Sequence, residues 1–445
     1  MLDQQAWLTL APDLDVEWQQ SYDEGLDVAD LETLCRTAAA TPGFSDEGAR
    51  EIVRLLRARP MREGYPYTEP SDLPSILAAC PETKPALSAP DPDALPDKIR
   101  GAWLGRAAGC LLGKPVEGFR RDKLIPLLEK TGNRPLRRYI CWKDISPDLA
   151  AELGLFRHTY WGDTLENGAP NDDDTNYTVL ALRLLETYGR NFTPNDVLES
   201  WMMWLPLFST CTAERVAYRH AASGLLPPAT ATQDNPFREW IGAQIRADFF
   251  GYIHPGNPQK AAEMAYRDAC VSHVKNGIYG EMLTAAMLAA AAVCQTPEEV
   301  LEAGLACIPS YCRLRRDIDL VRQWHGAGLS AAEITEKIHE TYDERRNHDW
   351  CLTTANAMIV AMALLCGQGD VGTSICLAVE AAFDTDCNGA TVGSIAGMLS
   401  GARSIEPCWT EPLQNCLHTA LLGLSTVSFD DLVSRTLGLI DLSAS

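Results

Sequence analysis

Apolar residues recur three or four positions apart through most of this sequence, which is the spacing of one face of an α-helix. Strict alternation of apolar and polar residues, which marks a half-buried strand, is scarce. The pattern predicts an all-α fold, an assembly of helices packed on helices. The clearest helical runs are residues 99–112, 179–185, 194–204, 259–271, 282–294, 353–366, 373–383 and 389–401.

Helix starts are marked locally as well. Ser45, Thr193, Thr296 and Ser330 each stand before a helical pattern, where a hydroxyl can accept a backbone N–H bond. Two of them are followed by proline, which suits the first helical position, and Ser330 opens a capping box. The turn-rich segments between helices are expected to be loops. They are residues 113–118, 248–258, 272–280 and 367–372.

Two of the predicted helices carry very small side chains. In residues 99–112, Gly101, Gly105 and Gly109 recur every fourth position, and residues 389–401 are equally rich in Gly, Ala and Ser. Small residues let a second helix approach closely. Charged residues interrupt the first run, so it is not a membrane helix. The run ends near residue 113, which puts Glu117 in a tight turn directly beyond a buried helix.

Residues 1–95 read as an acidic helical extension of a main domain that spans residues 96–445. The extension holds 7 Lys/Arg and 18 Asp/Glu, a balance of −11 out of −22 for all 445 residues. We expect two amphipathic helices in it, one from Asp30 to Thr37 and one after Ser45. Four prolines in residues 85–96 indicate a linker. The extension carries no motif tied to chemistry, so its expected role is packing or partner contact.

The composition narrows the class of partner and compartment. The strongly negative charge argues against nucleic acid or an anionic membrane as the main partner. The 15 cysteines are scattered without zinc-like spacing, which favours buried thiols in a reducing compartment. No signal peptide is evident, and residues 282–294 are too few to span a bilayer. We therefore expect a cytoplasmic protein; its oligomeric state stays open.

Three consecutive carboxylates stand out before the run 179–185: Asp172, Asp173 and Asp174. Acids at a helix N-terminus can simply cap it. They can also bind a hard cation, which prefers clustered oxygen ligands. Asp384 and Asp386 open the second small-residue helix and are therefore expected to be buried. If the two groups meet, five carboxylates converge, and such a cluster requires divalent cations.

The segment 367–372 offers a competing interpretation, because it matches the GxGxxG pattern of dinucleotide-binding proteins. That pattern needs a strand before the glycines. Here a long Ala/Met/Leu-rich helical run precedes them, so a loop between two helices is the simpler interpretation.

Four motifs, in order along residues 97–405, make the chain resemble the ADP-ribosylglycohydrolase family. The glycine-rich first helix and its glutamate match residues 101–117, and a Thr-Asp-Asp-Thr motif matches residues 172–175. A loop with a histidine and glycines matches residues 273–280, and a Gly-Asp-Thr-Asp-Thr motif matches residues 383–387. Each motif alone is weak evidence of relationship, but four in the right order favour the family.

The resemblance implies an orthogonal multi-helix bundle with two Mg²⁺ or Mn²⁺ ions and hydrolysis at the anomeric carbon of a ribose. The metals would bind the ribose 2- and 3-hydroxyls and a water. It assigns the residues as follows: metal ligands Asp172, Asp173, Asp174, Asp384 and Asp386; catalytic residues Glu117, Asp173 and Asp386; substrate-binding residues His273, Gly277, Tyr279, Gly280 and Phe383. The implied partner is an ADP-ribosylated protein or a ribosylated small molecule.

The chain departs from the family's motifs at four positions. Asp172 and Cys387 stand where the family has threonines, and Cys110 where an aspartate is common. Phe383 replaces a glycine. A neutral thiol is a poor magnesium ligand, so Cys387 is better explained as a packed small residue. These changes leave two alternatives open: a hydrolase of small N-ribosides or nucleotide metabolites, and a helical ADP-ribose-binding protein without activity.

Overall fold

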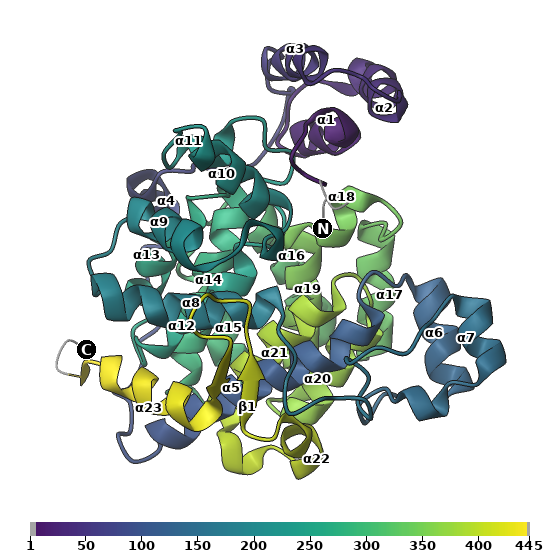
Figure 1. The fold of residues 1–445 in the computed structure, drawn as a ribbon. Helices are drawn as coiled ribbons and strands as arrows, with labels where there is room; N and C mark the ends of the chain where they lie inside the picture. The colour runs from purple at the N-terminus through teal and green to yellow at the C-terminus, as the bar shows by residue number, and fades with distance from the viewer. Residues whose placement is uncertain (1–5, 443–445) are drawn as a thin grey trace.

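The computed structural model describes residues 6–442, and these form the all-α fold that the hydrophobic pattern predicts (Figure 1). The single sheet in the described residues has two short antiparallel strands, β1 (Cys416–His418) and β2 (Thr426–Ser428), with Leu417 opposite Val427. None of the described helices combines the length and apolar character needed to cross a membrane.

Connections of varied length join the helices along the chain. The first four are α1 (Leu14–Asp23), α2 (Glu32–Ala40), α3 (Asp46–Arg57) and α4 (Leu73–Ala79). The next ten are α5 (Leu95–Gly113), α6 (Arg121–Lys130), α7 (Pro147–Leu153), α8 (Asp173–Tyr188), α9 (Pro194–Trp204), α10 (Thr212–Ala222), α11 (Ala229–Thr232), α12 (Asp248–Tyr252), α13 (Pro258–Ala269) and α14 (Lys275–Ala291). The last nine are α15 (Pro297–Leu305), α16 (Arg313–Gly326), α17 (Ala331–Thr341), α18 (Asn347–Cys351), α19 (Thr353–Gly367), α20 (Val371–Glu380), α21 (Thr385–Ser400), α22 (Pro407–Thr410) and α23 (Phe429–Leu439). Short 3-10 helices lie at Ala11–Asp13, Ala29–Leu31, Lys114–Val116, Trp142–Asp144, Leu207–Ser209, Gln244–Arg246, Ala402–Ser404 and Glu411–Leu413.

The predicted caps explain where several helices begin. The hydroxyls of Thr193, Thr296 and Ser330 each accept the backbone N–H of the residue three positions later. The acidic side chain of that residue accepts the backbone N–H of the capping residue in return. Ser45 accepts from the N–H of Gly48 at the start of α3. Local hydrogen bonding therefore fixes these starts without help from the rest of the fold.

Helices α5 and α21 form the centre of the molecule, and they run side by side in Figure 1. Glycines face glycines along the pair, with Gly101 against Gly397, Gly105 against Gly393 and Gly109 against Gly389. A Cβ atom at any of these positions would collide with the backbone of the facing helix. The contact is antiparallel, so the end of α5 meets the start of α21.

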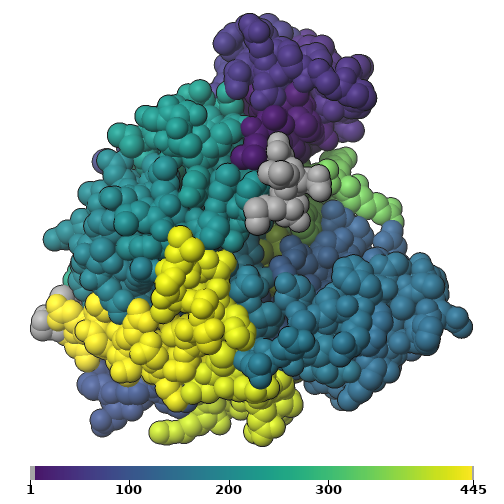
Figure 2. Space-filling view, viewed as in Figure 1, coloured from purple at the N-terminus to yellow at the C-terminus, as the bar shows by residue number. Residues whose placement is uncertain are grey.

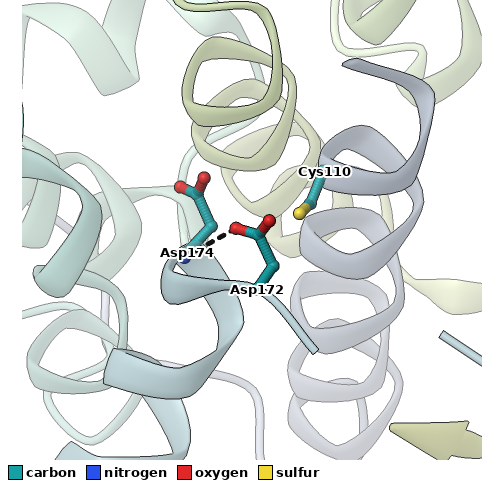
Figure 3. A group of neighbouring side chains, drawn as sticks. All are labelled: Cys110, Asp172 and Asp174. Carbon is teal, nitrogen blue, oxygen red and sulfur yellow. Dashed lines mark hydrogen bonds between the residues drawn. The ribbon is translucent and has the colours of Figure 1, made fainter. Parts of the chain in front are cut away.

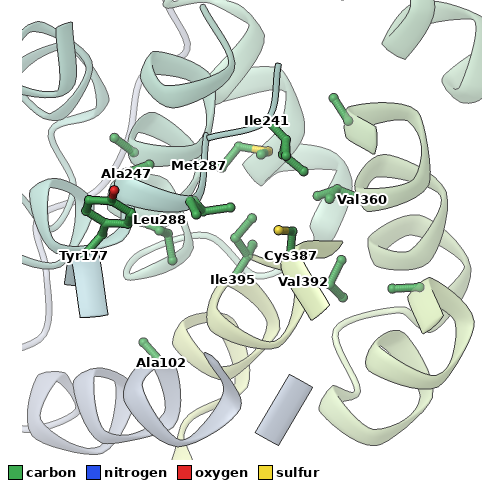
Figure 4. Close-up of a cluster of buried hydrophobic side chains, with 14 of the residues drawn as sticks. Ala102, Tyr177, Ile241, Ala247, Met287, Leu288, Val360, Cys387, Val392 and Ile395 are labelled. Carbon is green, nitrogen blue, oxygen red and sulfur yellow. The ribbon is translucent and has the colours of Figure 1, made fainter. Parts of the chain in front are cut away.

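The main hydrophobic core surrounds this pair. Helices α14 and α19 are buried on all sides, as their uniformly apolar sequences require. In Figure 4, Met287 and Leu288 of α14, Val360 of α19 and Val392 and Ile395 of α21 lie in one cluster. The core therefore holds the glycine-lined pair from several directions.

The N-terminal helices have a small core of their own. Leu14 and Trp18 of α1 pack with Cys35 of α2 and with Val53 and Leu56 of α3. These three helices cap one end of the molecule, while α4 lies apart from them against the main body (Figure 1). The space-filling view shows the cap seated on the segment that contains α10 and α11 (Figure 2).

Three expected loops differ from the structure. Residues 248–252 form α12, because Asp248 is buried against Arg106 and Tyr252 against Ser394. Helix α14 already begins at Lys275, and its early glycines serve close packing rather than a turn. Pro96 lies in the first turn of α5, where proline is tolerated, so the linker ends earlier than expected.

Residues 367–372 connect α19 to α20. The element before the glycines is therefore a helix and not the strand that a dinucleotide site requires, which removes the structural basis of that interpretation.

Candidate active site

The close contact of α5 with α21 brings the first two acidic groups together. A Cβ atom on Gly113 would collide with Thr385, so the end of α5 touches the start of α21. The chain then turns through a short 3-10 helix, and Glu117 follows it. Carboxylate oxygens of Glu117, Asp384 and Asp386 lie within 4.8 Å of one another.

The start of α8 adds the triple aspartate. Asp172 is the N-cap, and its Oδ1 accepts the backbone N–H of Asp174 at 2.9 Å (Figure 3). Carboxylate oxygens of Asp174 and Asp386 and the Cys387 sulfur lie within 4.8 Å of one another. Carboxylate oxygens of Asp172 and Asp174 and the Cys110 sulfur form a second group within the same distance. Capping and clustering are thus both present, and the two acidic segments meet, which the sequence left as a condition.

A buried arginine fixes the position of Asp174. Arg106 of α5 bonds the carbonyl oxygen of Asp174, and its Nη2 lies 3.3 Å from the carboxylate Oδ1. Its Nη1 bonds Asp248 at 2.9 Å. The three side chains are 0–1% exposed. Arg106 therefore ties α8 and α12 to the glycine-rich helix.

A lysine ammonium sits among the carboxylates. Lys114 Nζ lies 2.6 Å from Asp172, 2.7 Å from Glu117 and 3.2 Å from Asp386. Burial alone would lower the pKa of Lys114, but these carboxylates raise it well above its usual range. The side chain therefore stays charged. One ammonium and the shared guanidinium of Arg106 do not neutralise six acids.

The remaining negative charge shows in the carboxyl groups themselves. Burial, and then the charge of neighbouring aspartates, raises the pKa values of Asp173, Asp174 and Asp384 well above the ordinary range. The charge of Asp386, with burial, raises the pKa of Glu117 to about 7, although its side chain is 40% exposed. Positive charge is what this cluster lacks.

The donor atoms present fit a divalent cation. Asp174 Oδ2 and Asp386 Oδ1 are buried and have no hydrogen-bond partner among residues 6–442. Buried carboxylate oxygens are seldom left unpaired. Clustered carboxylates are also the ligands that Mg²⁺ and Mn²⁺ prefer. Burial raises the pKa of the Cys110 and Cys387 thiols well above normal, so both remain neutral and poor ligands for these ions.

The carboxylates open into a cavity of about 220 Å³. Its lining combines acids with aromatic and small side chains from seven segments of the chain. The lining residues are Trp7, Glu117, Asp173, Cys211, Thr212, Glu214, Trp240, Ile241, Gly242, Ile245, Trp350, Cys351, Asp384, Asp386 and Cys387.

Comparison with known proteins agrees with this geometry. The model of the ADP-ribosylglycohydrolase family matches residues 91–440, most of the chain. The chain belongs to the ADP-ribosylglycohydrolase family. A protein of Archaeoglobus fulgidus, described as uncharacterized, is 24% identical over 324 residues, which are 72% of this chain and 92% of that protein. A solved structure described as an ADP-ribosylglycohydrolase-related protein complex has 19% identity and a TM-score of 0.47, covering 79% of this chain and 99% of its own.

Four of the substrate-binding residues that the resemblance suggested lie outside the carboxylate cavity of this family member. His273, Gly277, Tyr279 and Gly280 do not line the carboxylate cavity. His273 is buried and bonds Ser272, Gly277 packs against the carbonyl of Arg238, and the Tyr279 hydroxyl donates to the carbonyl of Pro70. The segment 273–280 thus packs the start of α14 onto the chain around it.

Phe383 acts through its backbone in the structure. It has φ 57°, the left-handed region that glycine tolerates best, which fits the glycine of the family motif at this position. Its ring packs near His339, and its carbonyl accepts the Trp350 Nε1–H at 2.8 Å. Phe383 therefore orients Trp350, which lines the cavity, although Phe383 itself is not part of the lining.

Several residues in the cavity or beside it were not singled out by the sequence pattern. Lys114 is three residues before Glu117, so a Lys–Glu pair could have been suspected there. Trp7, Trp240 and Trp350 come from three distant segments. Glu214 pairs with Arg246, which also pairs with Asp268. Only packing places these side chains together.

Proposed function

We propose that this protein hydrolyses the glycosidic bond at the anomeric carbon of a ribosyl group, in a reaction that depends on Mg²⁺ or Mn²⁺. Membership of the ADP-ribosylglycohydrolase family supports a glycosyl hydrolase. The observation that carries the proposal is that Glu117, Asp173, Asp384 and Asp386 line one small cavity. Glycoside hydrolysis needs carboxyl groups around the scissile bond.

We propose that two cations bind in this cluster. Asp172, Asp173 and Asp174 would hold one side of the pair, and Asp384 and Asp386 the other. The close approach of Asp174 to Asp386 supports a shared site. When bound, the cations would supply positive charge that lowers the pKa of water and orients ribose hydroxyls. Lys114, which lies among the same carboxylates, would have to move aside.

The protein's own groups then have distinct roles. Glu117 is partly exposed at the cavity beside Asp384 and Asp386, and its carboxylate can accept a proton from the attacking water. Asp173 and Asp386 lie where their charge offsets the positive charge that develops on the ribose ring in an oxocarbenium-like transition state. The buried walls of the cavity exclude bulk water and strengthen these interactions.

The size of the cavity favours a small substrate. A volume of about 220 Å³ is below the roughly 300–1,000 Å³ typical of ligand sites. It suits a riboside better than a whole ADP-ribosyl group. A small N-riboside or nucleotide-derived metabolite is therefore the second candidate substrate beside an ADP-ribosylated protein.

The direct test is product release from a panel of ribosyl compounds, with Mg²⁺ or Mn²⁺ and again with a chelator. The panel contains ADP-ribosyl-arginine, ADP-ribosyl-serine, poly(ADP-ribose), O-acetyl-ADP-ribose, NAD and simple N-ribosides. Metal-dependent release from any member supports the proposal and identifies the leaving group. No release from any of them, with metal bound, would point to a binding protein instead.

Replacement of single carboxylates separates chemistry from metal binding. Glu117→Gln should lower kcat about 100-fold or more, because the proton acceptor is lost, while Mn²⁺ still binds. Asp386→Asn should lose both activity and most of the Mn²⁺ affinity. Turnover rates and calorimetric titration with Mn²⁺ measure the two effects. If Glu117→Gln stays within a few-fold of the parent protein, Glu117 is not the base.

A further inference from the structure

Trp7 reaches the carboxylate cavity from a part of the chain outside the family match. The match begins at residue 91, yet Trp7 lines the same cavity as Glu117 and Asp384. Its backbone has φ 64°, which is rare for a bulky residue and costs free energy. The Arg215 guanidinium lies 4.8 Å from the centre of its ring. This strained, ring-anchored placement indicates that the position of Trp7 matters.

Two further tryptophans complete an aromatic wall. Trp240 and Trp350 also line the cavity, and both pack in one apolar cluster with Trp7. The Trp350 Nε1–H is bonded to the Phe383 carbonyl, and Arg120 lies 4.7 Å from its ring centre. The Trp240 Nε1–H donates to His348 Nδ1 at 3.1 Å. The indole N–H groups of Trp240 and Trp350 are thus occupied by protein, so a ligand meets these two side chains through the parts of their rings that line the cavity.

Helix α1 of the extension supports this wall from behind. Val16 belongs to the same apolar cluster as Trp240. His348 Nε2 lies 3.2 Å from Asp23, so a chain of hydrogen bonds runs from α1 to Trp240. Arg238, two residues before Trp240, pairs with Glu17 at 2.7 Å and Glu24 at 2.6 Å. The extension therefore supplies one tryptophan and holds another in place.

We infer that the N-terminal extension completes the substrate pocket, and that Trp7, Trp240 and Trp350 bind a planar heteroaromatic leaving group of the ribosyl substrate. This inference rests on the proposed function, because it names the substrate class of the same site. Indole rings stack on flat heterocycles whatever their substituents, because every such heterocycle presents a π-face. The substrate class is accordingly an N-riboside whose base faces the tryptophans while its ribose faces the carboxylates.

The small cavity decides which ring of a substrate the wall can take. A ring on the anomeric carbon stays next to the carboxylates, whereas the adenine of an ADP-ribosyl group is separated from that carbon by a pyrophosphate and a second ribose. About 220 Å³ does not hold that whole length. The leaving group, not the distant adenine, therefore faces Trp7.

The test measures binding of free bases to the full chain by calorimetry, which requires no glycosidic bond and no turnover. Hypoxanthine and nicotinamide are the probes, with methyl β-D-ribofuranoside and ADP-ribose as ligands that lack a heteroaromatic leaving group. Trp7→Ala should raise the Kd for the bases about tenfold. Trp7→Phe should restore most of the parent's affinity for them. The affinity for methyl riboside and ADP-ribose should change less than about twofold.

Trp324→Ala is the matched control, because Trp324 is also half-buried, contacts Lys337 and does not line the cavity. It should bind all four ligands like the parent. The inference is overturned if the parent binds neither base, if Trp7→Ala binds them normally, or if ADP-ribose loses as much affinity as the bases. Failure of the proposed function would appear separately, as no metal-dependent release from the riboside panel.

Discussion

At the scale of single residues, the site is decided by an imbalance of charge. Six carboxyl groups meet around Lys114 and Arg106, and burial together with the charge of neighbouring aspartates raises the pKa values of Asp173, Asp174 and Asp384. The triple aspartate and the pair Asp384 and Asp386 are recognisable in the sequence because their residue types are unusual before apolar runs. Lys114 is not recognisable in the same way, because a lysine in a turn is common in sequences. Its importance follows from its three carboxylate neighbours, which only the structure shows.

Lys114 is expected to compete with a divalent cation for the same carboxylates. Lys114→Met should therefore strengthen Mn²⁺ binding, by roughly tenfold for removal of one nearby positive charge, and should lower the stability of the metal-free protein. Calorimetric titration and thermal unfolding with and without Mn²⁺ measure both. Lys130→Met, which removes only an exposed pair with Glu152, is the control. Unchanged or weaker Mn²⁺ binding in Lys114→Met would contradict the competition.

His254 should make the protein sensitive to acid. Burial, with the neighbouring Arg190, Lys260 and Arg267, lowers the pKa of His254 from 6.5 to about 4. Its Nδ1 bonds the Phe250 carbonyl at 2.8 Å, and Arg190 Nη1 lies 3.0 Å from Nε2, which suits a neutral ring. Between pH 6.5 and 4 the unfolded chain binds a proton that the folded protein does not. Stability is then lost as the pH falls through this window.

The size of this effect follows from the shift. The lowered pKa removes about 3 kcal/mol of stability at pH 4 relative to pH 7. His254→Gln should lose stability at pH 7, where a good hydrogen bond is gone, yet show a smaller further loss on acidification. Denaturant unfolding at pH 7, 5.5 and 4.5 gives the comparison. Parallel pH profiles for parent and variant would show that His254 does not titrate in this way.

At the scale of elements, the glycine-lined contact of α5 with α21 builds the site. It sets Gly113 against Thr385 and so fixes where Glu117 stands relative to Asp384 and Asp386. The sequence predicts both small-residue helices and the four helix starts at Ser45, Thr193, Thr296 and Ser330, because periodicity and caps are local. It does not show that the two glycine stripes face each other. It also misplaces α12 and the start of α14, whose turn-like residues are held helical by buried partners.

Gly105→Ala should disrupt this contact. The added Cβ would collide with the backbone of Gly393, which has no flexible side chain to move aside. We expect a loss of roughly 3 kcal/mol in stability, at the upper end for an overpacked core, and a larger loss of metal binding than of helicity. Gly438→Ala in α23 is the matched control, because no neighbouring atom of the described residues lies within 4 Å of the Cβ atom that it adds. It should be neutral or stabilising by up to about 1 kcal/mol. Equal stability of the two variants would contradict the close approach.

At the scale of the whole molecule, the acidic extension is part of the working structure. Its Glu17 and Glu24 pair with Arg238, and its Glu69 pairs with Arg313. These three of its 18 acidic residues thus lie in a buried interface with residues of the following part of the chain. The partners are more than 200 positions apart in the chain, so no local pattern reveals them.

Breaking this interface should loosen the extension. Arg238→Met leaves Glu17 buried without its arginine and leaves Glu24 with Lys275 as its remaining cation, and loss of one member of a buried pair costs about 3–5 kcal/mol. We expect lower stability and faster proteolysis within residues 6–90. Limited proteolysis and denaturant unfolding measure this. Arg59→Met, whose pair with Asp30 is exposed, should cost less than about 1 kcal/mol. Similar losses in both variants would show that the buried pairs do not anchor the extension.

The sequence by itself determined the helices, the two small-residue stripes, the acidic motifs and, through them, the family. These features depend on neighbours within one or two helical turns, where spacing dictates geometry. Only the tertiary structure decided that Lys114 stands among the carboxylates, that residues 273–280 lie outside the cavity, and that Trp7 lines it. Those outcomes depend on which faces pack together across long stretches of chain, and close packing of whole helices settles that, not the pattern of any one segment.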